Sequence, residues 1–477
     1  MRTWVRDLAV TLLVPGWRQW PTRRALAVVL LGLGVVLPVG VVLAGFATGR
    51  GWVALSLDAT FLGWSTFALL GAFGARVAAV LMWLAEGERN RERLVSAVAG
   101  LVVVALPLGM GAVGVARARS DIAPVFTDTE GPLFDAAATA TTLAATTTTL
   151  AATSTTAVPT TVAERSPIVR PSTTTTTTEA QRPLPARPRS GVDAARVADV
   201  YNILLLGGDA GPGRGGLRTD TMMLLSVHTP SGRASLVSLP RDMKGLLFPP
   251  DSPLGRRYPY GFTELANAVY PIVSSKSDLR AAYEVDDIRP GVVAAAQAIG
   301  YSLDVTIHDY VLIDMQGFLD LIDALGGVTV NVTKRIPMPG NIPGAPTQYP
   351  DAIGPGTIHM DGSTALGYVR SRYADSDFQR TARQRALLAA LARQVSFSDV
   401  VANYGAVTSA IGGTLRTSLT PDELAGLLAL IGGETAIVES VGLVPPLVSI
   451  TDPDFQKMAE VVGAVRVAIA EGQDSGY

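Results

Sequence analysis

The sequence of 477 residues contains no cysteine and only three histidines, His228, His308 and His359. The missing cysteine excludes disulfides, thiol nucleophiles, iron–sulfur clusters and cysteine-based zinc sites. Because imidazole ligands are also scarce, a metal bound by this chain would be a hard cation held by carboxylates. Lysine is rare as well, so the positive charge is almost entirely arginine; the lysines are Lys244, Lys276, Lys334 and Lys457.

The overall charge is close to zero, with 39 Lys and Arg residues against 41 Asp and Glu residues, a net charge of −2. This balance argues against a globally basic nucleic-acid-binding protein. The composition is 48% hydrophobic and only 17% charged, which is too apolar for one ordinary soluble domain. A chain of this length has room for two or three structural units.

Long apolar runs are concentrated in residues 1–118. Residues 25–46 and 94–116 carry no charge and are each long enough to cross a bilayer. Residues 52–84 predict one more span, although Asp58 and Arg76 interrupt it. The alternative of a cleavable signal peptide is disfavoured, because the first apolar run ends at Pro-Gly-Trp rather than at a small-residue cleavage site.

Flanking arginines predict the orientation of these three transmembrane helices. By the positive-inside rule, the N-terminus and the loop after the second span are cytoplasmic. Everything after Arg117 would then lie outside the cell, so the chain is predicted to be a multi-pass cell-membrane protein. The arginines that carry this argument are Arg2, Arg6, Arg18, Arg23 and Arg24 before the first span, and Arg89, Arg91 and Arg93 after the second.

Residues 119–195 are rich in Thr, Ala, Ser and Pro, including the threonine runs 146–149 and 173–178. A segment of this composition cannot bury a hydrophobic core, so it predicts a disordered linker. As a flexible tether, it would hold the domain formed by residues 196–477 above the membrane.

Residues 196–477 alternate short apolar runs with amphipathic stretches, which predicts an α/β layer fold. The run 221–227 is apolar enough for the centre of a sheet. Expected strands are residues 201–207, 221–227, 234–239 and 328–332, and expected helices are residues 292–299, 315–325, 380–395, 421–431 and 455–470.

A glycine-rich loop joins the first two predicted strands. It contains G-x-G-x-x-G, but a strand rather than a helix follows, so we reject a dinucleotide-binding site. The same loop brings Asp209 and Asp220 to one edge of two antiparallel strands. Two carboxylates there suit Mg²⁺, which uses one or two carboxylates together with substrate phosphates. Solvated loop acids remain the alternative.

Residues 370–385, RSRYADSDFQRTARQR, are the most concentrated basic stretch of the chain. Ser376 and Gln379 fit a capping box, which predicts a helix that starts near Asp377. Within that helix Arg380, Arg383 and Gln384 share a face close to a helix end that favours anions.

Residues 366–372 are predicted as a strand, on which Arg370 and Arg372 point to one side. Together with the arginines of the following helix they would form a pyrophosphate clamp, because guanidinium groups bind phosphate oxygens bidentately. A solvated basic helix paired with its own acids is the alternative. Arg241, which follows the third strand in Ser-Leu-Pro-Arg-Asp, is expected at the same sheet edge as Asp209.

Five sequence stretches resemble the LytR-CpsA-Psr family of cell-wall glycopolymer ligases. They are NILLLGGDA, RTDTMMLLSV, VSLPRD, FLDLIDALGGVTVNV and MDGSTALGYVRSRYADSDFQRTARQR, in the family's order across most of residues 200–395. The membrane-anchored N-terminus also fits the family pattern, and the Arg- and Ala-rich composition resembles actinobacterial proteins.

The resemblance implies an αβα sandwich that binds a glycopolymer linked to polyprenyl (pyro)phosphate, with the isoprenoid in an apolar groove. The polymer would pass to a peptidoglycan hydroxyl as a phosphodiester. By the same resemblance Asp209 and Asp220 would bind Mg²⁺. The pyrophosphate would be held by Arg241, Arg370, Arg372, Arg380, Arg383 and Gln384.

Three residues are expected to be catalytic, namely Arg241, Asp375 and Asp377. Either aspartate could be the base that accepts the proton of the acceptor hydroxyl, and either could instead orient the arginines. The competing functions are a non-catalytic polyprenyl-phosphate-binding or regulatory membrane protein and a polyprenyl-pyrophosphate hydrolase. A Ser-His-Asp triad is not expected, because the sequence lacks G-x-S-x-G.

One position departs from the family pattern. The family commonly has Lys-Ile-Asn-x-x-Tyr after the Pro-Arg-Asp motif, whereas this chain has LANAVY, with Leu265 in place of the lysine. Asn267 and Tyr270 are retained. The missing cation bears on how the donor is held rather than on the class of protein.

Overall fold

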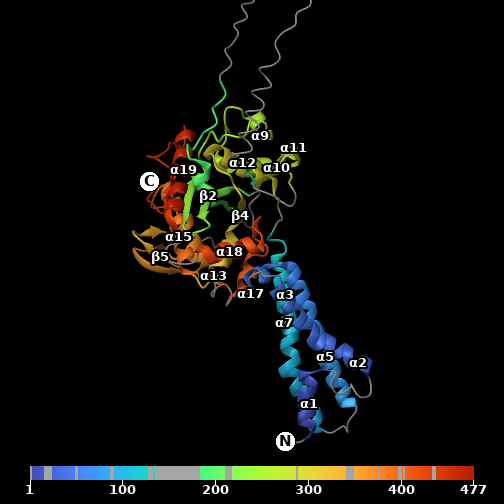
Figure 1. Ribbon diagram of the computed structural model, residues 1–477. Helices are drawn as coiled ribbons and strands as arrows, with labels where there is room; N and C mark the ends of the chain where they lie inside the picture. The colour runs from blue at the N-terminus through green and yellow to red at the C-terminus, as the bar shows by residue number, and fades with distance from the viewer. Residues whose placement is uncertain are drawn as a thin grey trace, which may run out of the picture.

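The chain forms a bundle of N-terminal helices and an α/β domain, which meet at one end of the bundle (Figure 1). Most of the predicted linker and the glycine-rich loop lie outside the residues that the structure describes, so the disorder and the domain boundaries remain predictions. The computed structural model describes residues 3–15, 24–48, 52–85, 91–126, 133–134, 183–209, 217–285, 288–339, 349–373, 375–395, 400, 403–431 and 437–477.

Three segments of the N-terminal bundle are helical over a length that could span a membrane, namely Arg24–Ala47, Ala59–Ala85 and Ala97–Ile122. They coincide with the three predicted spans and are candidates for crossing a membrane by length and composition. The central region contains one long helix, α5, after the short α4. The elements are α1 (Thr3–Leu13), α2 (Arg24–Leu31), η2 (Gly32–Val36), α3 (Leu37–Ala47), α4 (Trp52–Leu57), α5 (Ala59–Ala85), α6 (Arg91–Gly100), η3 (Leu101–Ala105) and α7 (Leu106–Ile122).

The first and third spans each contain a π-helical turn, η2 or η3, just before a proline at the start of the next helix. Proline has no N–H group, so the widened turn accommodates the change in hydrogen bonding. Arg76, the charge within α5, donates from Nη1 to the carbonyls of Gly34 at 2.9 Å and Ala72 at 3.1 Å. The guanidinium is thus directed at backbone oxygens, as expected for a charge inside an apolar span.

The α/β domain is built on a mixed sheet of six strands in the order β10-β3-β2-β1-β4-β9. β1 runs antiparallel to β2 and parallel to β4, and β3 runs parallel to β10. β2 lies near the centre, as its apolar sequence predicts. The bounds are β1 (Val200–Gly208), β2 (Thr219–His228), β3 (Ala234–Leu239), β4 (Asp309–Ile313), β9 (Leu415–Thr417) and β10 (Ile437–Gly442).

Alternating side chains of the central strands feed two cores. Leu204 and Leu206 of β1 are buried in the larger core with residues of α10, α12 and α19. Ile203 and Leu205 point to the other face, where α18 contributes Leu427. Helices therefore cover both faces of the sheet, an αβα arrangement. The helices named here are α10 (Val269–Ser275), α12 (Pro290–Leu303), α18 (Pro421–Ile431) and α19 (Phe455–Glu471).

A smaller two-stranded sheet with its own hydrophobic core lies beside the main sheet. Strand β5 pairs with β8, and this hairpin-like sheet packs with α14 and α15 around a separate core that includes Val330, Met360 and Leu387. The elements are α13 (Met315–Ala324), β5 (Val328–Val332), β6 (Ile336–Pro337), β7 (Ala352–Ile353), β8 (Gly356–Met360), α14 (Gly362–Arg370), α15 (Asp377–Gln394) and α17 (Tyr404–Ile411).

Apart from the strand predicted at residues 366–372, all the predicted strands and helices of the α/β domain are present, with ends that differ by a few residues. The remaining short elements connect the layers; they are η4 (Ala194–Val197), α9 (Pro253–Arg257), η5 (Ala266–Ala268) and α11 (Ser277–Ala282).

The predicted strand at residues 366–372 is wrong. This stretch belongs to helix α14, which ends at Arg370, so Arg370 and Arg372 are not on alternating positions of a strand. Asp361 caps the helix, since its side chain accepts a hydrogen bond from the backbone N–H of Thr364 at 2.8 Å. The cap and the packing of Ala365 and Val369 outweigh the short polar-apolar alternation that suggested a strand.

Candidate functional site

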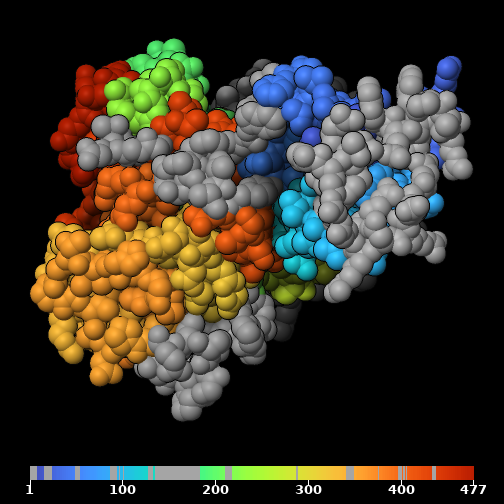
Figure 2. Space-filling view, turned by 90° about the horizontal axis from the view of Figure 1, so that it is seen from below, coloured from blue at the N-terminus to red at the C-terminus, as the bar shows by residue number. Residues whose placement is uncertain are grey.

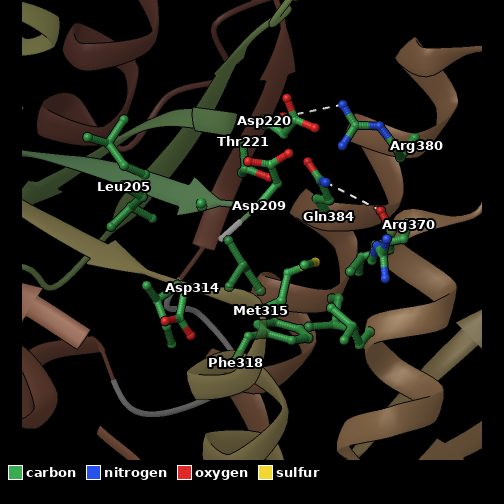
Figure 3. Close-up of a pocket in the computed structure, with 18 of the residues that line it drawn as sticks. Leu205, Asp209, Asp220, Thr221, Asp314, Met315, Phe318, Arg370, Arg380 and Gln384 are labelled. Carbon is green, nitrogen blue, oxygen red and sulfur yellow. Dashed lines mark hydrogen bonds between the residues drawn. The ribbon is translucent and has the colours of Figure 1, made fainter. Parts of the chain in front are cut away.

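A cavity of about 500 Å³ lies between the main sheet and helices α13, α14 and α15. In Figure 3, Asp209, Asp220, Arg380 and Gln384 gather at one end of it, and Phe318 lies at the other. We call the first group the polar end; it comprises Asp209, Asp220, Arg241, Arg370, Arg372, Arg380 and Gln384. The apolar wall comprises Leu205, Val311, Ile313, Met315, Phe318, Leu321, Ile322, Leu366, Val369, Leu387, Leu388, Leu391 and Leu415.

One face of α15 runs along the cavity and changes from polar to apolar. Arg380 and Gln384 lie in its first two turns, and Leu387, Leu388 and Leu391 follow on the same side. Residues three or four positions apart share a helix face, so the sequence of α15 alone produces this gradient. The cavity can therefore take a molecule with a charged head and an apolar tail.

The start of α15 is fixed by its cap. The Ser376 side chain accepts a hydrogen bond from the backbone N–H of Gln379 at 3.4 Å, and the helix begins at Asp377. Both features were predicted from the sequence. The positive end of the helix thus lies in the turn that carries Arg380, which favours an anion at this end of the cavity.

Asp220 is held by three neighbours at the polar end. Arg241 Nη1 donates to its Oδ2 at 2.6 Å, and Asn267 Nδ2 donates to its Oδ1 at 2.8 Å. Arg380 Nη2 donates to its backbone carbonyl at 3.3 Å. These contacts join the end of β3, the helix η5, the start of β2 and α15 into one polar cluster, as expected for Arg241 and Asp220.

Asp377 is the common partner of three arginines, although it does not line the cavity itself. Arg380 binds it through two hydrogen bonds of 2.9 Å, while Arg241 and Arg372 approach its Oδ1 to 3.4 and 3.8 Å. Burial by itself would raise the pKa of Asp377, but the hydrogen bonds and charge of Arg380 and the two further arginines outweigh it and lower the pKa. Both oxygens of Asp377 are therefore engaged by arginines, chiefly by Arg380.

Arg383 and Asp375 form a second buried pair, behind the polar end. Arg383 Nη1 lies 2.6 Å from Asp375 Oδ2, and its other nitrogens donate to the carbonyls of Tyr368 and Ser371. Lys334 Nζ also approaches Asp375, at 3.1 Å. Neither Arg383 nor Asp375 is among the described residues that line the cavity, so the shared face with Arg380 and Gln384 does not bring Arg383 to the same site.

Arg370, Arg372 and Gln384 complete the polar end. Gln384 Nε2 donates to the carbonyl of Val369 at 3.3 Å, and its Oε1 is buried without a hydrogen-bond partner among the described residues. The Arg372 side chain is 59% exposed, so it is accessible to a ligand from solvent. Counting Arg218 and Asp314, five arginines and three aspartates line the cavity, an excess of positive charge that suits phosphate.

Asp209, directly after β1, and Asp220, at the start of β2, both line the polar end, as expected from the neighbouring antiparallel strands. Within the described ranges, no group of three or more His, Asp or Glu side chains could hold a metal ion. Two carboxylates still fit Mg²⁺, which takes its remaining ligands from water and substrate phosphate. Asn267, whose Nδ2 donates to Asp220, has a buried Oδ1 with no hydrogen-bond partner among the described residues, and amide oxygens are of the kind that Mg²⁺ prefers.

Some lining residues were not predicted to be functional. Asn267 was noted only as a retained family position, and its bond to Asp220 could not be foreseen because η5 and β2 are distant in sequence. The family resemblance implied an apolar groove for the isoprenoid, but none of the residues of the apolar wall was predicted. Of its members, Phe318 and Met315 come from a helix whose amphipathic pattern is the same as that of an ordinary core-facing helix.

Several curated proteins are similar to this chain. A polyisoprenyl-teichoic acid–peptidoglycan teichoic acid transferase TagU of Oceanobacillus iheyensis is 30% identical over 244 residues, 49% of this chain and 64% of that protein. The protein of the same name in Bacillus mycoides is 28% identical over 260 residues, 53% of this chain and 72% of that protein. Biofilm regulatory protein A of Streptococcus mutans is 28% identical over 236 residues, 48% and 52% of the two chains. The chain thus spans less than two thirds of the first and third of these relatives.

Solved structures are also similar to this chain. The crystal structure of Bacillus subtilis TagV is 21% identical, with a TM-score of 0.41, covering 58% of this chain and 98% of that one. A protein from Streptococcus agalactiae is 22% identical, with a TM-score of 0.42, covering 59% and 91%. A model of the LytR_cpsA_psr family matches residues 168–443, more than half of the chain. The chain therefore belongs to the LytR-CpsA-Psr family.

Proposed function

We propose that the chain transfers a glycopolymer from a polyprenyl-pyrophosphate-linked donor to peptidoglycan, as a phosphodiester. The observation that carries this proposal is the cavity itself, because an arginine-rich polar end and a long apolar wall are continuous within it. The two transferases named above, which by name act on teichoic acid and peptidoglycan, support the same class of reaction.

In this scheme the pyrophosphate lies at the polar end and the isoprenoid along the apolar wall. Arg241, Arg370, Arg372 and Arg380 would neutralise the phosphate oxygens, which is the main requirement of phosphoryl transfer. The acceptor hydroxyl attacks the sugar-side phosphorus, the bond to the bridging oxygen breaks, and polyprenyl phosphate leaves.

Asp377 is proposed to hold arginines rather than to act as the base. A carboxylate with a lowered pKa is a weak base, and its oxygens are already engaged by Arg380 and Arg241. A loose transition state requires little proton abstraction, so we assign the hydroxyl proton to an oxygen of the departing phosphate. Arg383, paired with Asp375, is proposed to hold the carbonyls of Tyr368 and Ser371 behind the polar end.

Mg²⁺ is proposed as the cofactor, held by Asp209 and Asp220 with Asn267 beside them. When bound it would supply positive charge next to the phosphates. We also propose that the α/β domain is extracellular, because the distribution of arginines around the three candidate spans places the N-terminus in the cytoplasm.

The test is a transfer assay with the purified full chain in liposomes that contain a labelled lipid-linked polymer, with soluble peptidoglycan as acceptor. The double variant Arg241→Ala/Arg372→Ala is expected to lose transfer, and Arg393→Ala, an exposed arginine at the far end of α15, is the matched control. Transfer by the double variant at the wild-type rate would contradict the proposal. Omission of Mg²⁺ tests the cofactor separately.

The same assay separates the alternative functions. A hydrolase would release polymer phosphate into solution without labelling peptidoglycan. A non-catalytic binding or regulatory protein would retain the labelled donor unchanged; the Streptococcus mutans relative is regulatory by name.

A further inference from the structure

The chain that leaves the third candidate span does not separate from the α/β domain. The N–H of Thr417 donates to the carbonyl of Val125 at 2.9 Å, and Phe126 forms a parallel bridge with Thr417. Thr417 belongs to β9, the edge strand of the main sheet. Residues 125–126, only a few positions after α7, therefore cover a sheet edge that would otherwise expose its backbone groups.

A second contact lies a few residues further along the chain. Phe134 exchanges two backbone hydrogen bonds with Ile307, of 3.1 and 2.9 Å, just before β4. Its ring is 5% exposed and belongs to the main core. The ring packs so closely on Gly300 that a Cβ there would lie 2.3 Å from it. The chain is thus attached to the domain at two places, beside β9 and at the residues that precede β4.

Side chains of the two regions share one apolar cluster. One end of the helical bundle buries a small apolar cluster that includes Leu57, Leu62 and Ile122. Phe126, which follows α7, and Leu424 of α18 in the α/β domain pack against this cluster. Helix α7 packs on α17 and α4 packs on α18, and in Figure 2 cyan atoms lie beside orange-red atoms of the domain. The contact is therefore a packed interface and not a single backbone crossing.

Helix α17 meets α7 at one glycine. A Cβ on Gly412 would lie 2.6 Å from the Cβ and 2.7 Å from the Cα of Asp121, whereas a Cβ on the neighbouring Gly413 would meet nothing within 4 Å. Gly412 has an ordinary helical φ of −60°, so the close approach of Asp121, and not backbone conformation, leaves no room for a side chain.

This interface adjoins the apolar wall of the cavity. Helix α17 packs on α13 as well as on α7. α13 supplies Met315 and Phe318 to the wall, and β9, which pairs with residues 125–126, supplies Leu415. In Figure 3, Asp220 and Arg380 of the polar end lie across the cavity from Phe318 of α13.

We propose that residues 121–126 are a docking joint that holds the apolar wall of the cavity beside the outer end of the membrane helices, so that a lipid-linked substrate enters from the bilayer without crossing water. The lipid part of this inference rests on the proposed function; the joint itself rests only on the contacts above. It differs from the flexible tether that the composition predicts, because residues on the near side of the Thr-rich stretch already pack on the domain.

The joint can be tested by distance measurement, since the chain has no native cysteine to interfere with labelling. Spin labels on Ser120→Cys and Asp474→Cys, both exposed, report the position of α7 relative to the domain in liposomes. We expect one narrow distance distribution in the parent chain and in Gly413→Leu, and a broad one in Gly412→Leu. Phe126→Ser is a second disruptive variant, in case Gly412→Leu fails to fold. A distribution that stays narrow in both disruptive variants would overturn the joint.

The lipid route is tested with two donors. Transfer from a long-chain donor in the bilayer should fall about tenfold in Gly412→Leu, because the cavity is no longer held at the membrane surface. Transfer from a water-soluble short-chain donor should be unchanged, and Gly413→Leu should match the parent with both. Equal losses with the two donors would overturn the route. If the parent chain transfers neither donor, the proposed function and the lipid route fail together, and the distance measurement still decides the joint.

Discussion

The two ends of the cavity hold their side chains in different ways. At the polar end, Asp220, Arg241, Asp377 and Arg380 form a chain of ion pairs and hydrogen bonds of 2.6 to 3.4 Å. The apolar wall is made of Leu, Ile, Val, Met and Phe side chains that pack without directional bonds. Loss of one partner should therefore disturb several groups at the polar end, whereas the wall should respond in proportion to the volume that is removed.

Among single substitutions, the largest effect is expected from Asp377→Asn, which retains the shape of the side chain and removes the charge that holds three arginines. Transfer should fall about 100-fold, since small displacements of charged groups around a reacting phosphate are costly. The measurement is kcat in the liposome assay, with Asp452→Asn, an exposed aspartate, as control.

The pH dependence distinguishes a positioning role from a base. The lowered pKa keeps Asp377 ionised at neutral pH, so its stabilising effect should be complete above its ordinary pKa and be lost only as the pH falls through the lowered value. Transfer by the wild type should consequently show no acidic limb due to Asp377 near neutrality. An acidic limb near pH 6 that disappears in Asp377→Asn would identify Asp377 as a base instead.

A smaller and selective effect is expected from Phe318→Ala in the apolar wall. The half-buried ring contributes apolar contact, and its loss should raise KM for a long-chain donor about tenfold while kcat stays the same. A short-chain donor should be unaffected. Leu430→Ala, on the exposed side of α18, serves as control. A fall in kcat with both donors would show that the two ends of the cavity are not separable.

The smallest effect is expected at the cap of α15. Ser376→Ala removes the acceptor for the Gln379 N–H and should lower the free energy of unfolding by about 1 kcal/mol, whereas Ser376→Gly should lower it by only a few tenths. In thermal unfolding of the detergent-solubilised chain, the alanine variant should melt roughly 2 °C below the wild type. Equal midpoints for the alanine variant and the wild type would show that the cap of α15 does not stabilise the fold.

Much of the fold and of the polar end could be predicted from patterns within short stretches of the sequence. The apolar runs predicted β1, β2 and β3, and the Ser376 cap predicted the start of α15, because these depend on neighbouring residues. The antiparallel pairing of β1 with β2 likewise placed Asp209 and Asp220 together. Each of these features depends on contacts between residues that are close together in the sequence.

Other features depend on packing that local pattern does not contain. Residues 366–372 alternate like a strand, yet Asp361 caps a helix there. Arg383 shares a helix face with Arg380, but the partners Asp375 and Ser371 draw it behind the cavity. The joint at residues 121–126 depends on β9, nearly three hundred positions away, and the threonine-rich composition beyond it gave no indication of the contact.

The arrangement of α15 has one further consequence. An α-helix rises about 1.5 Å per residue, so Arg380 and Leu391 are separated along its axis by about 16 Å. The helix therefore fixes the distance between the arginine that faces a phosphate and the leucine that faces an apolar chain. A deletion of one residue between Arg380 and Leu391 would rotate their side chains by about 100° relative to each other around the helix axis. With the intact helix, selection among lipid-linked molecules would depend on the distance between their phosphate and their lipid chain, whatever polymer the phosphate carries.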